Sequence, residues 1–175
     1  MIISLTGFMG CGKSSVGRKL SKLLCCNYVD LDSVIEQQEG RSIPEIFATD
    51  GEAAFRKMEL AALKSVVSEH TQTIVLSLGG GTIMTPECAR LVYAHTHCIY
   101  LRASVDTLYD NLKDEAEGRP MLKNDGQDKA NALKDRIEEL MNLRASTYEA
   151  TAHIIIDTDG QSIDSLSQEI ISRLK

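Results

Sequence analysis

Apolar and polar positions alternate along this chain in two kinds of segment. Short segments typical of strands are separated by longer ones in which apolar residues return at helical spacing. The strand segments are 2–6, 27–31, 73–78, 97–101 and 153–157. This alternation predicts an α/β fold with a parallel sheet covered by helices on both faces. Ligands of such folds bind outside the carboxyl ends of the strands.

Two segments interrupt the alternation. Residues 32–70 form a long helical stretch, which we expect to break near Asp50-Gly51. Residues 113–126 are polar and contain glycine and proline. In a phosphotransferase such a segment is a natural lid that closes over the nucleotide and excludes water. The alternative interpretation is a plain surface loop.

The first strand leads directly into a glycine-rich motif. Residues 7–14 read Gly-Phe-Met-Gly-Cys-Gly-Lys-Ser, the pattern G-x-x-x-x-G-K-[ST] of a phosphate loop. Backbone N–H groups of such a loop surround phosphate oxygens, and the helix that follows points its positive end at them. Lys13 can reach the β- and γ-phosphates, and Ser14 can offer its hydroxyl to Mg²⁺. The predicted ATP-binding residues here are Gly10, Cys11, Gly12, Lys13, Ser14 and Ser15.

Two predicted helices carry charges on faces that should be buried. Glu59 lies within the apolar stripe of 52–70, with Arg56 three positions before it. Arg144 occupies the corresponding stripe of 127–150. A charge on an inward face needs a partner. Either arginine could extend to solvent or pair with an internal carboxylate, but two of them beside a phosphate loop favour an anionic ligand held by guanidinium groups.

Acidic residues and glycines follow the next two strands. Asp30 and Asp32 lie at the end of the second strand, and the third is followed by Gly79, Gly80 and Gly81. The third strand lacks the aspartate of the usual second nucleotide motif, so Asp30 is expected to bind Mg²⁺ in its place. We expect Asp32 to orient the acceptor hydroxyl and the glycines to present N–H groups to the acceptor.

Composition narrows the functional classes further. The 175 residues are 43% apolar, which suggests one compact domain. A net charge of −6 argues against a broad nucleic-acid-binding surface. No apolar run approaches the roughly 20 residues of a membrane span, and the N-terminus has no signal-peptide pattern. The five cysteines are odd in number and lack metal-ligand spacing, so we expect reduced thiols and a cytoplasmic protein.

The ordered set of these motifs resembles shikimate kinase over nearly the whole chain. The matching segments are 7–14, Asp30-Leu-Asp32, Phe55-Arg56-Lys-Met-Glu59, Gly79-Gly80-Gly81, Arg119-Pro120-Met-Leu and Arg144-Ala-Ser-Thr-Tyr148. The resemblance implies transfer of the ATP γ-phosphate to the 3-hydroxyl of shikimate, on the way to chorismate and the aromatic amino acids. It also implies a three-layer, P-loop NTPase-like fold with a five-stranded parallel sheet in the order 2-3-1-4-5, as in nucleoside monophosphate kinases.

The resemblance also implies roles for individual residues. Arg56 and Arg144 would hold the shikimate carboxylate, Asp32 would bind ring hydroxyls, and the backbone of 79–81 would contact the substrate. Arg119 would neutralise the transferring phosphate, which makes Lys13, Asp32 and Arg119 the expected catalytic residues.

The nucleotide base has two further expected contacts. Members of the family often have an arginine that packs on adenine, and Lys113 is its nearest counterpart here. A late loop near 158–160 would complete the adenine pocket. The whole of 1–175 would form one kinase domain, with 32–60 as its substrate-binding segment and 113–126 as its lid, and we expect a monomer.

Three other functions remain open at this point. A gluconate or nucleoside monophosphate kinase would share the phosphate loop, although the Arg56/Glu59 pair and the glycine run favour shikimate. A GTP-binding switch would need an Asn-Lys-x-Asp motif, which the chain lacks. A regulatory nucleotide-binding module is disfavoured because Lys13, Ser14, Asp30 and Arg119 occur together.

Overall fold

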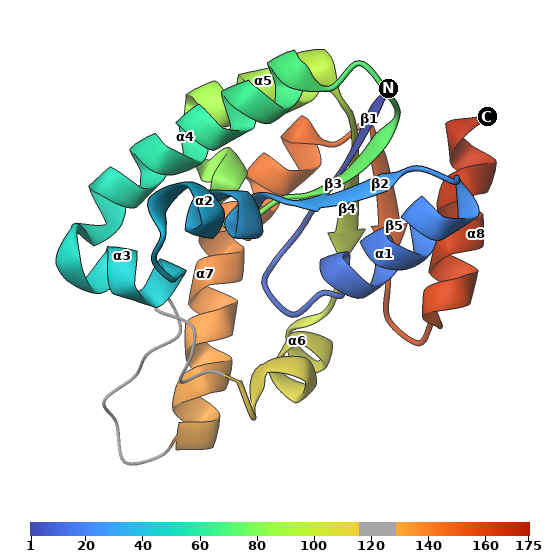
Figure 1. The fold of residues 1–175 in the computed structure, drawn as a ribbon. Helices are drawn as coiled ribbons and strands as arrows, with labels where there is room; N and C mark the ends of the chain where they lie inside the picture. The colour runs from blue at the N-terminus through green and yellow to red at the C-terminus, as the bar shows by residue number, and fades with distance from the viewer. Residues whose placement is uncertain (116–128) are drawn as a thin grey trace.

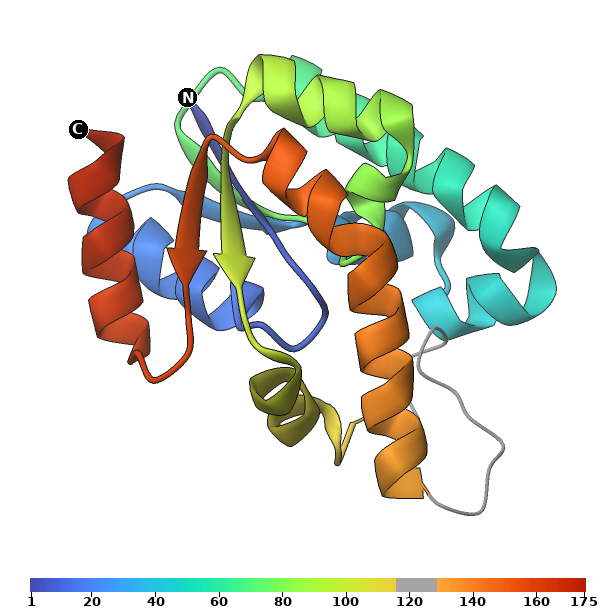
Figure 2. The ribbon, with the colours of Figure 1, turned by 180° about the vertical axis from the view of Figure 1, so that it is seen from behind.

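The computed structural model describes residues 1–115 and 129–175 and contains a central parallel sheet (Figures 1 and 2). The strand order is β2-β3-β1-β4-β5, which confirms the predicted fold class and topology. The strands are β1 (Ile2–Thr6), β2 (Asn27–Asp30), β3 (Ile74–Ser77), β4 (His97–Arg102) and β5 (Ile154–Asp157). Each lies within one residue of its predicted bounds, because strands covered on both faces are recognisable as short apolar runs.

Helices cover both faces of the sheet. On one face α1 (Lys13–Leu23) packs beside α8 (Ile163–Leu174). The other face carries α4 (Gly51–Glu69), α5 (Pro86–His95) and α7 (Lys129–Thr151). The side chains of β1 and β3 are almost completely buried between these layers, so the central strands form the middle of the core. No helix in 1–115 or 129–175 is long and apolar enough to span a membrane.

The segment between β2 and β3 forms three helices, where the sequence predicted one break. These are α2 (Leu31–Glu39), α3 (Ile43–Thr49) and α4. The break at Asp50-Gly51 is confirmed, and the missed one lies at 40–42. Gly40 ends α2 with a left-handed φ of 66°, a conformation that glycine adopts without steric cost. Ser42 and Glu45 then form a capping box that starts α3.

The carboxyl ends of the strands bring the candidate residues together. The phosphate loop follows β1, Asp30 ends β2, and the glycine turn 79–81 follows β3. The short helix α6 (Val105–Leu112) follows β4, and the 158–161 loop follows β5. Because all five strands run parallel, these connections lie along one edge of the sheet, where ligands of this architecture bind.

Candidate active site

The phosphate loop has the backbone conformation that its glycines allow. Gly7, Gly10 and Gly12 have φ angles of 145°, 81° and 97°. At Gly10 a side chain would meet both this backbone conformation and Leu112, whose Cγ lies 2.7 Å from the position of an added Cβ. Helix α1 begins directly after the loop, at Lys13, so its positive end faces the loop.

Lys13 is folded back onto the phosphate loop. Its Nζ atom donates to the Gly7 carbonyl at 2.7 Å and to the Phe8 carbonyl at 2.9 Å. The side chain is only 9% exposed, and Cys11 beside it is also buried. Cys11 therefore contributes to the packing of the loop, and its Sγ atom lies 3.8 Å from Lys13 Nζ.

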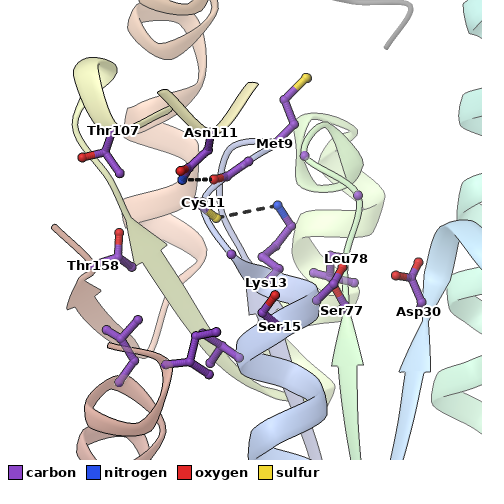
Figure 3. Close-up of a pocket in the computed structure, with 18 of the residues that line it drawn as sticks. Met9, Cys11, Lys13, Ser15, Asp30, Ser77, Leu78, Thr107, Asn111 and Thr158 are labelled. Carbon is purple, nitrogen blue, oxygen red and sulfur yellow. Dashed lines mark hydrogen bonds between the residues drawn. The ribbon is translucent and has the colours of Figure 1, made fainter. Parts of the chain in front are cut away.

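The phosphate loop lines a cavity of about 670 Å³, which we call the nucleotide cavity (Figure 3). Thr107 and Thr158 lie on one side of Lys13 and Asp30 on the other. The 158–160 loop expected from the resemblance therefore does reach the cavity, through Thr158 and Gly160. All six predicted phosphate-binding residues line it: Gly10, Cys11, Gly12, Lys13, Ser14 and Ser15.

Helix α6 provides a contact that sequence reasoning missed. Asn111 lines the nucleotide cavity and donates from Nδ2 to the Gly10 carbonyl at 2.8 Å. An asparagine near a helix end gave no signal for a partner 101 positions away. Lys113, the expected counterpart of the adenine-packing arginine, is exposed, does not line the cavity, and lies 3.8 Å from Asp110. Arg119 and the lid residues from 116 onward lie outside the described residues.

The two predicted metal ligands, Ser14 and Asp30, both line the nucleotide cavity. The Tyr28 hydroxyl donates to Asp30 Oδ2 at 3.2 Å. Burial raises the pKa of Tyr28, so its hydroxyl stays protonated. Asp30 Oδ1 caps α2 by accepting from the Asp32 and Ser33 N–H groups. One carboxylate and one hydroxyl beside a phosphate site fit Mg²⁺, which takes few protein ligands and keeps several waters.

A smaller cavity of about 270 Å³, here called the acceptor cavity, adjoins the nucleotide cavity. Met9, Asp32, Gly79 and Gly80 line both, so the two spaces meet between the phosphate loop and the glycine turn. The wall of the acceptor cavity also includes apolar groups from α3 and α4, together with the predicted arginines: Ile43, Pro44, Phe47, Phe55, Arg56 and Arg144.

Arg56 is held in the acceptor cavity by a fully buried carboxylate. Its Nη1 atom donates to Glu59 Oε2 at 2.9 Å, and Glu59 is 0% exposed. The other oxygen, Oε1, accepts from the buried Thr82 hydroxyl at 2.7 Å. Glu52 contacts Arg56 from the exposed side at 3.3 Å. Both oxygens of Glu59 are thus engaged, as a buried charge requires. The sequence predicted the pair but not Thr82.

Arg144 has different surroundings. It is 5% exposed, and no carboxylate of the described residues lies within ion-pair distance of it. Its guanidinium lies 5.8 Å from the centre of the Phe8 ring, and its Nη1 is 3.5 Å from the Gly80 carbonyl. A buried cation without a counter-ion is costly, so its position on the acceptor cavity favours an anionic ligand there.

Asp32 lies where the two cavities meet. Burial, together with the nearby charges of Asp30 and Glu59, raises the pKa of Asp32 from 3.8 to about 6, and Lys13 opposes this shift. A carboxyl group with this pKa is ionised at neutral pH yet basic enough to accept a proton. Its neighbourhood suits a group that binds and orients a hydroxyl.

The glycine turn allows side chains to approach its backbone closely. An added Cβ at Gly81 would lie 2.5 Å from Arg56 Nη2, so Arg56 can hold its place only beside a glycine. At Gly79 an added Cβ would lie 3.0 Å from Asp32 Oδ1 and 3.2 Å from Glu59 Oε1. The turn is therefore surrounded by the polar groups of the acceptor cavity.

Comparison with known proteins agrees with this geometry. The family model described as "Shikimate kinase" matches residues 9–175. Shikimate kinase of Thermus thermophilus is 40% identical over 172 residues, which cover 98% of this chain and 89% of that protein. Shikimate kinase of Dictyoglomus turgidum is 38% identical over 178 residues, covering 99% and 96%.

Solved structures show the same relationship. The structure of shikimate kinase from Acinetobacter baumannii in complex with shikimate superimposes with a TM-score of 0.90 at 29% identity, covering 99% of this chain and 92% of that one. The enzyme from Bacteroides thetaiotaomicron gives a TM-score of 0.88 at 28% identity, covering 99% and 98%. The nearly full-length match, together with the two adjoining cavities, leads to one conclusion: this chain belongs to the shikimate kinase family.

Proposed function

We propose that this chain carries out the family's reaction, transfer of the ATP γ-phosphate to the 3-hydroxyl of shikimate, at the junction of the two cavities. The observation that carries the assignment is the buried Arg144, which has no carboxylate partner in 1–115 or 129–175 and lies with Arg56 on a small cavity that adjoins the phosphate loop. Shikimate has one carboxylate and three ring hydroxyls. The arginines hold the carboxylate, which leaves a hydroxyl at Asp32, on the side facing the nucleotide cavity.

The remaining groups of the site follow from this placement. Lys13 binds the transferring phosphate and neutralises charge that develops during transfer. Asp32 accepts a hydrogen bond from the attacking hydroxyl and orients it in line. Arg119, from the proposed lid 113–126, adds positive charge after closure, and Lys113 would have to leave Asp110 and move towards the nucleotide cavity to contribute to the adenine site. Segment 32–60 closes the acceptor side of a single kinase domain, which we propose acts as a cytoplasmic monomer.

Ser14 and Asp30 are the residues that would hold Mg²⁺. The ion supplies charge neutralisation on the β- and γ-phosphates when bound. Ser14 offers a hydroxyl at the start of α1, and Asp30 lines the same cavity. Asp30 caps α2 through Oδ1, so it would serve the ion through its other carboxylate oxygen.

A coupled assay of ADP release tests the proposed function directly. With ATP and Mg²⁺, shikimate should be turned over, and EDTA should abolish turnover. Gluconate and AMP, tested at the same concentrations, should give little or no ADP, because nearly the whole chain matches the shikimate kinase family. Efficient turnover of gluconate or AMP, with none of shikimate, would contradict the proposal.

Replacing Asp30 with asparagine should raise the Mg²⁺ concentration needed for half-maximal activity, and excess Mg²⁺ should restore part of the activity. Asparagine is also a good helix N-cap, so α2 should begin at the same residue. The measurement is a Mg²⁺ titration at saturating ATP and shikimate, with Asp32→Asn as the matched control. If excess Mg²⁺ rescued Asp32→Asn instead, the roles of the two aspartates would have to be exchanged.

A further inference from the structure

The glycine turn carries backbone donors that no described residue satisfies. Leu78 N–H donates to the Leu5 carbonyl, and Thr82 N–H donates to the Gly79 carbonyl. Among residues 1–115 and 129–175, no acceptor is found for the N–H groups of Gly79, Gly80 or Gly81. Gly81 is buried and lines the acceptor cavity. A buried N–H group without a partner is rare, and at the wall of a cavity it indicates a ligand.

The orientation of the same turn is fixed from α7 by Tyr148. This side chain is 0% exposed, and its hydroxyl donates to the Gly80 carbonyl. Arg144 makes a longer contact, 3.5 Å, to the same oxygen. Burial raises the pKa of Tyr148, so the hydroxyl remains a donor throughout the neutral range. The Tyr148 ring stacks on Tyr100 of β4, 5.0 Å between centres, which holds the ring in place.

Peptide geometry connects this hydrogen bond to the cavity. The Gly80 carbonyl and the Gly81 N–H group belong to one peptide unit, which is trans because the described residues contain no cis peptide bond. In a trans unit these two groups point in opposite directions. Tyr148 does not line the acceptor cavity, whereas Gly81 does. A carbonyl held towards Tyr148 therefore directs the Gly81 N–H group away from α7.

We propose that Tyr148 is a positioning residue for the acceptor: by holding the Gly80 carbonyl, it directs the Gly81 N–H group into the acceptor cavity on the side of Arg56, towards the shikimate carboxylate. This inference rests on the assignment of the acceptor cavity to shikimate. The turn needs an external contact to fix its orientation, because its three glycines have no side chains that would limit their φ and ψ angles. Without Tyr148, the Arg144 guanidinium becomes the remaining donor to the Gly80 carbonyl and is drawn away from the substrate.

The test compares Tyr148→Phe with Tyr100→Phe. Both variants remove one hydroxyl from the same stacked pair, and only the first removes a bond to the glycine turn. We expect Tyr148→Phe to raise KM for shikimate about 5- to 30-fold and to leave KM for ATP within about twofold. Tyr100→Phe should leave both KM values within about twofold. Equal effects of the two variants, or an equal rise in both KM values for Tyr148→Phe, would overturn the inference.

A second measurement does not depend on turnover. The chain has 12 glycines, so ¹⁵N-glycine labelling gives a short list of amide signals in which those of the turn can be assigned by substitution. On addition of shikimate alone, the Gly81 signal of the parent should move downfield, and in Tyr148→Phe this shift should be lost or halved. An unchanged shift in the variant refutes the positioning role. No response to shikimate in the parent, together with no turnover, refutes the proposed function instead.

Discussion

Asp32→Asn is expected to lower kcat by about 100- to 10,000-fold, the usual contribution of a group that accepts a proton or hydrogen bond from the attacking atom. Asparagine keeps the size and one acceptor oxygen but loses the charge. KM for ATP should change little, because the phosphate loop is untouched. The measurement is steady-state kinetics at saturating Mg²⁺. A variant with kcat within about threefold of the parent would show that Asp32 has no part in the chemical step.

The pH dependence of the parent should report the same group. The pKa of Asp32 is raised to about 6, and the carboxylate is the active form. The kcat/KM for shikimate should therefore fall as the pH drops below about 6, and this limb should be missing from the residual activity of Asp32→Asn. A parent profile that stays flat down to pH 5 would contradict this role.

The same pKa has a consequence for folding stability. Its rise from 3.8 to about 6 means that the folded state favours neutral Asp32. Protonated Asp32 therefore adds to the free energy of unfolding, fully below about pH 4, and this stabilisation is lost as the pH rises through 6. At pH 8 the charge costs about 2 to 3 kcal/mol, so Asp32→Asn should then unfold at a Tm roughly 5 to 10 °C higher than the parent. At pH 4 the two Tm values should nearly coincide. Thermal unfolding of both proteins at pH 8 and pH 4 checks the sign of the Tm difference between Asp32→Asn and the parent.

Arg144→Ala and Arg56→Ala are expected to lower kcat/KM for shikimate by about 30- to 3000-fold each. Each removes one charged contact to a carboxylate in a partly dry cavity, a loss of roughly 2–5 kcal/mol. ATP binding, measured by titration with a non-hydrolysable analogue, should stay near that of the parent. An arginine whose alanine variant keeps near-normal kcat/KM has a structural role only.

The two arginine variants should differ in their free energy of unfolding. Arg56→Ala leaves the fully buried carboxylate of Glu59 without its ion-pair partner, so we expect a loss of about 3–5 kcal/mol in the free energy of unfolding. Arg144 has no carboxylate partner among the described residues, so its removal should be neutral or stabilising. Urea unfolding of both variants measures this contrast. A larger destabilisation by Arg144→Ala would show that its charge is compensated within the protein.

Local sequence signals predicted the parts of this molecule that depend on local structure. The strands were identified because each is a short apolar run, and the phosphate loop because its glycines and lysine have fixed spacing. The inward positions of Arg56 and Arg144 followed from helical periodicity. The break at 40–42 is local as well, and the capping box of Ser42 with Glu45 would have revealed it.

The remaining site contacts join residues that are far apart in the sequence. Asn111 reaches Gly10 across 101 positions, and Tyr148 reaches Gly80 across 68. Such contacts depend on how α6 and α7 pack against the sheet, and no pattern within either helix encodes that packing. The proposed role of Arg119 remains a prediction, because that residue lies outside the described part of the chain.

If Lys13 binds the phosphates as proposed, its folded-back position makes nucleotide binding an exchange of hydrogen-bond partners. Without phosphate, the ammonium group already has two carbonyl acceptors, those of Gly7 and Phe8. Hydrogen bonds to a charged group contribute about 1.5–3 kcal/mol each, and any of them that ATP displaces is subtracted from the affinity of the phosphates for Lys13. The same carbonyls are available to Lys13 again when ADP departs. With the role proposed for Lys13, these two carbonyls compete with the product for its ammonium group, which would limit how tightly ADP is retained.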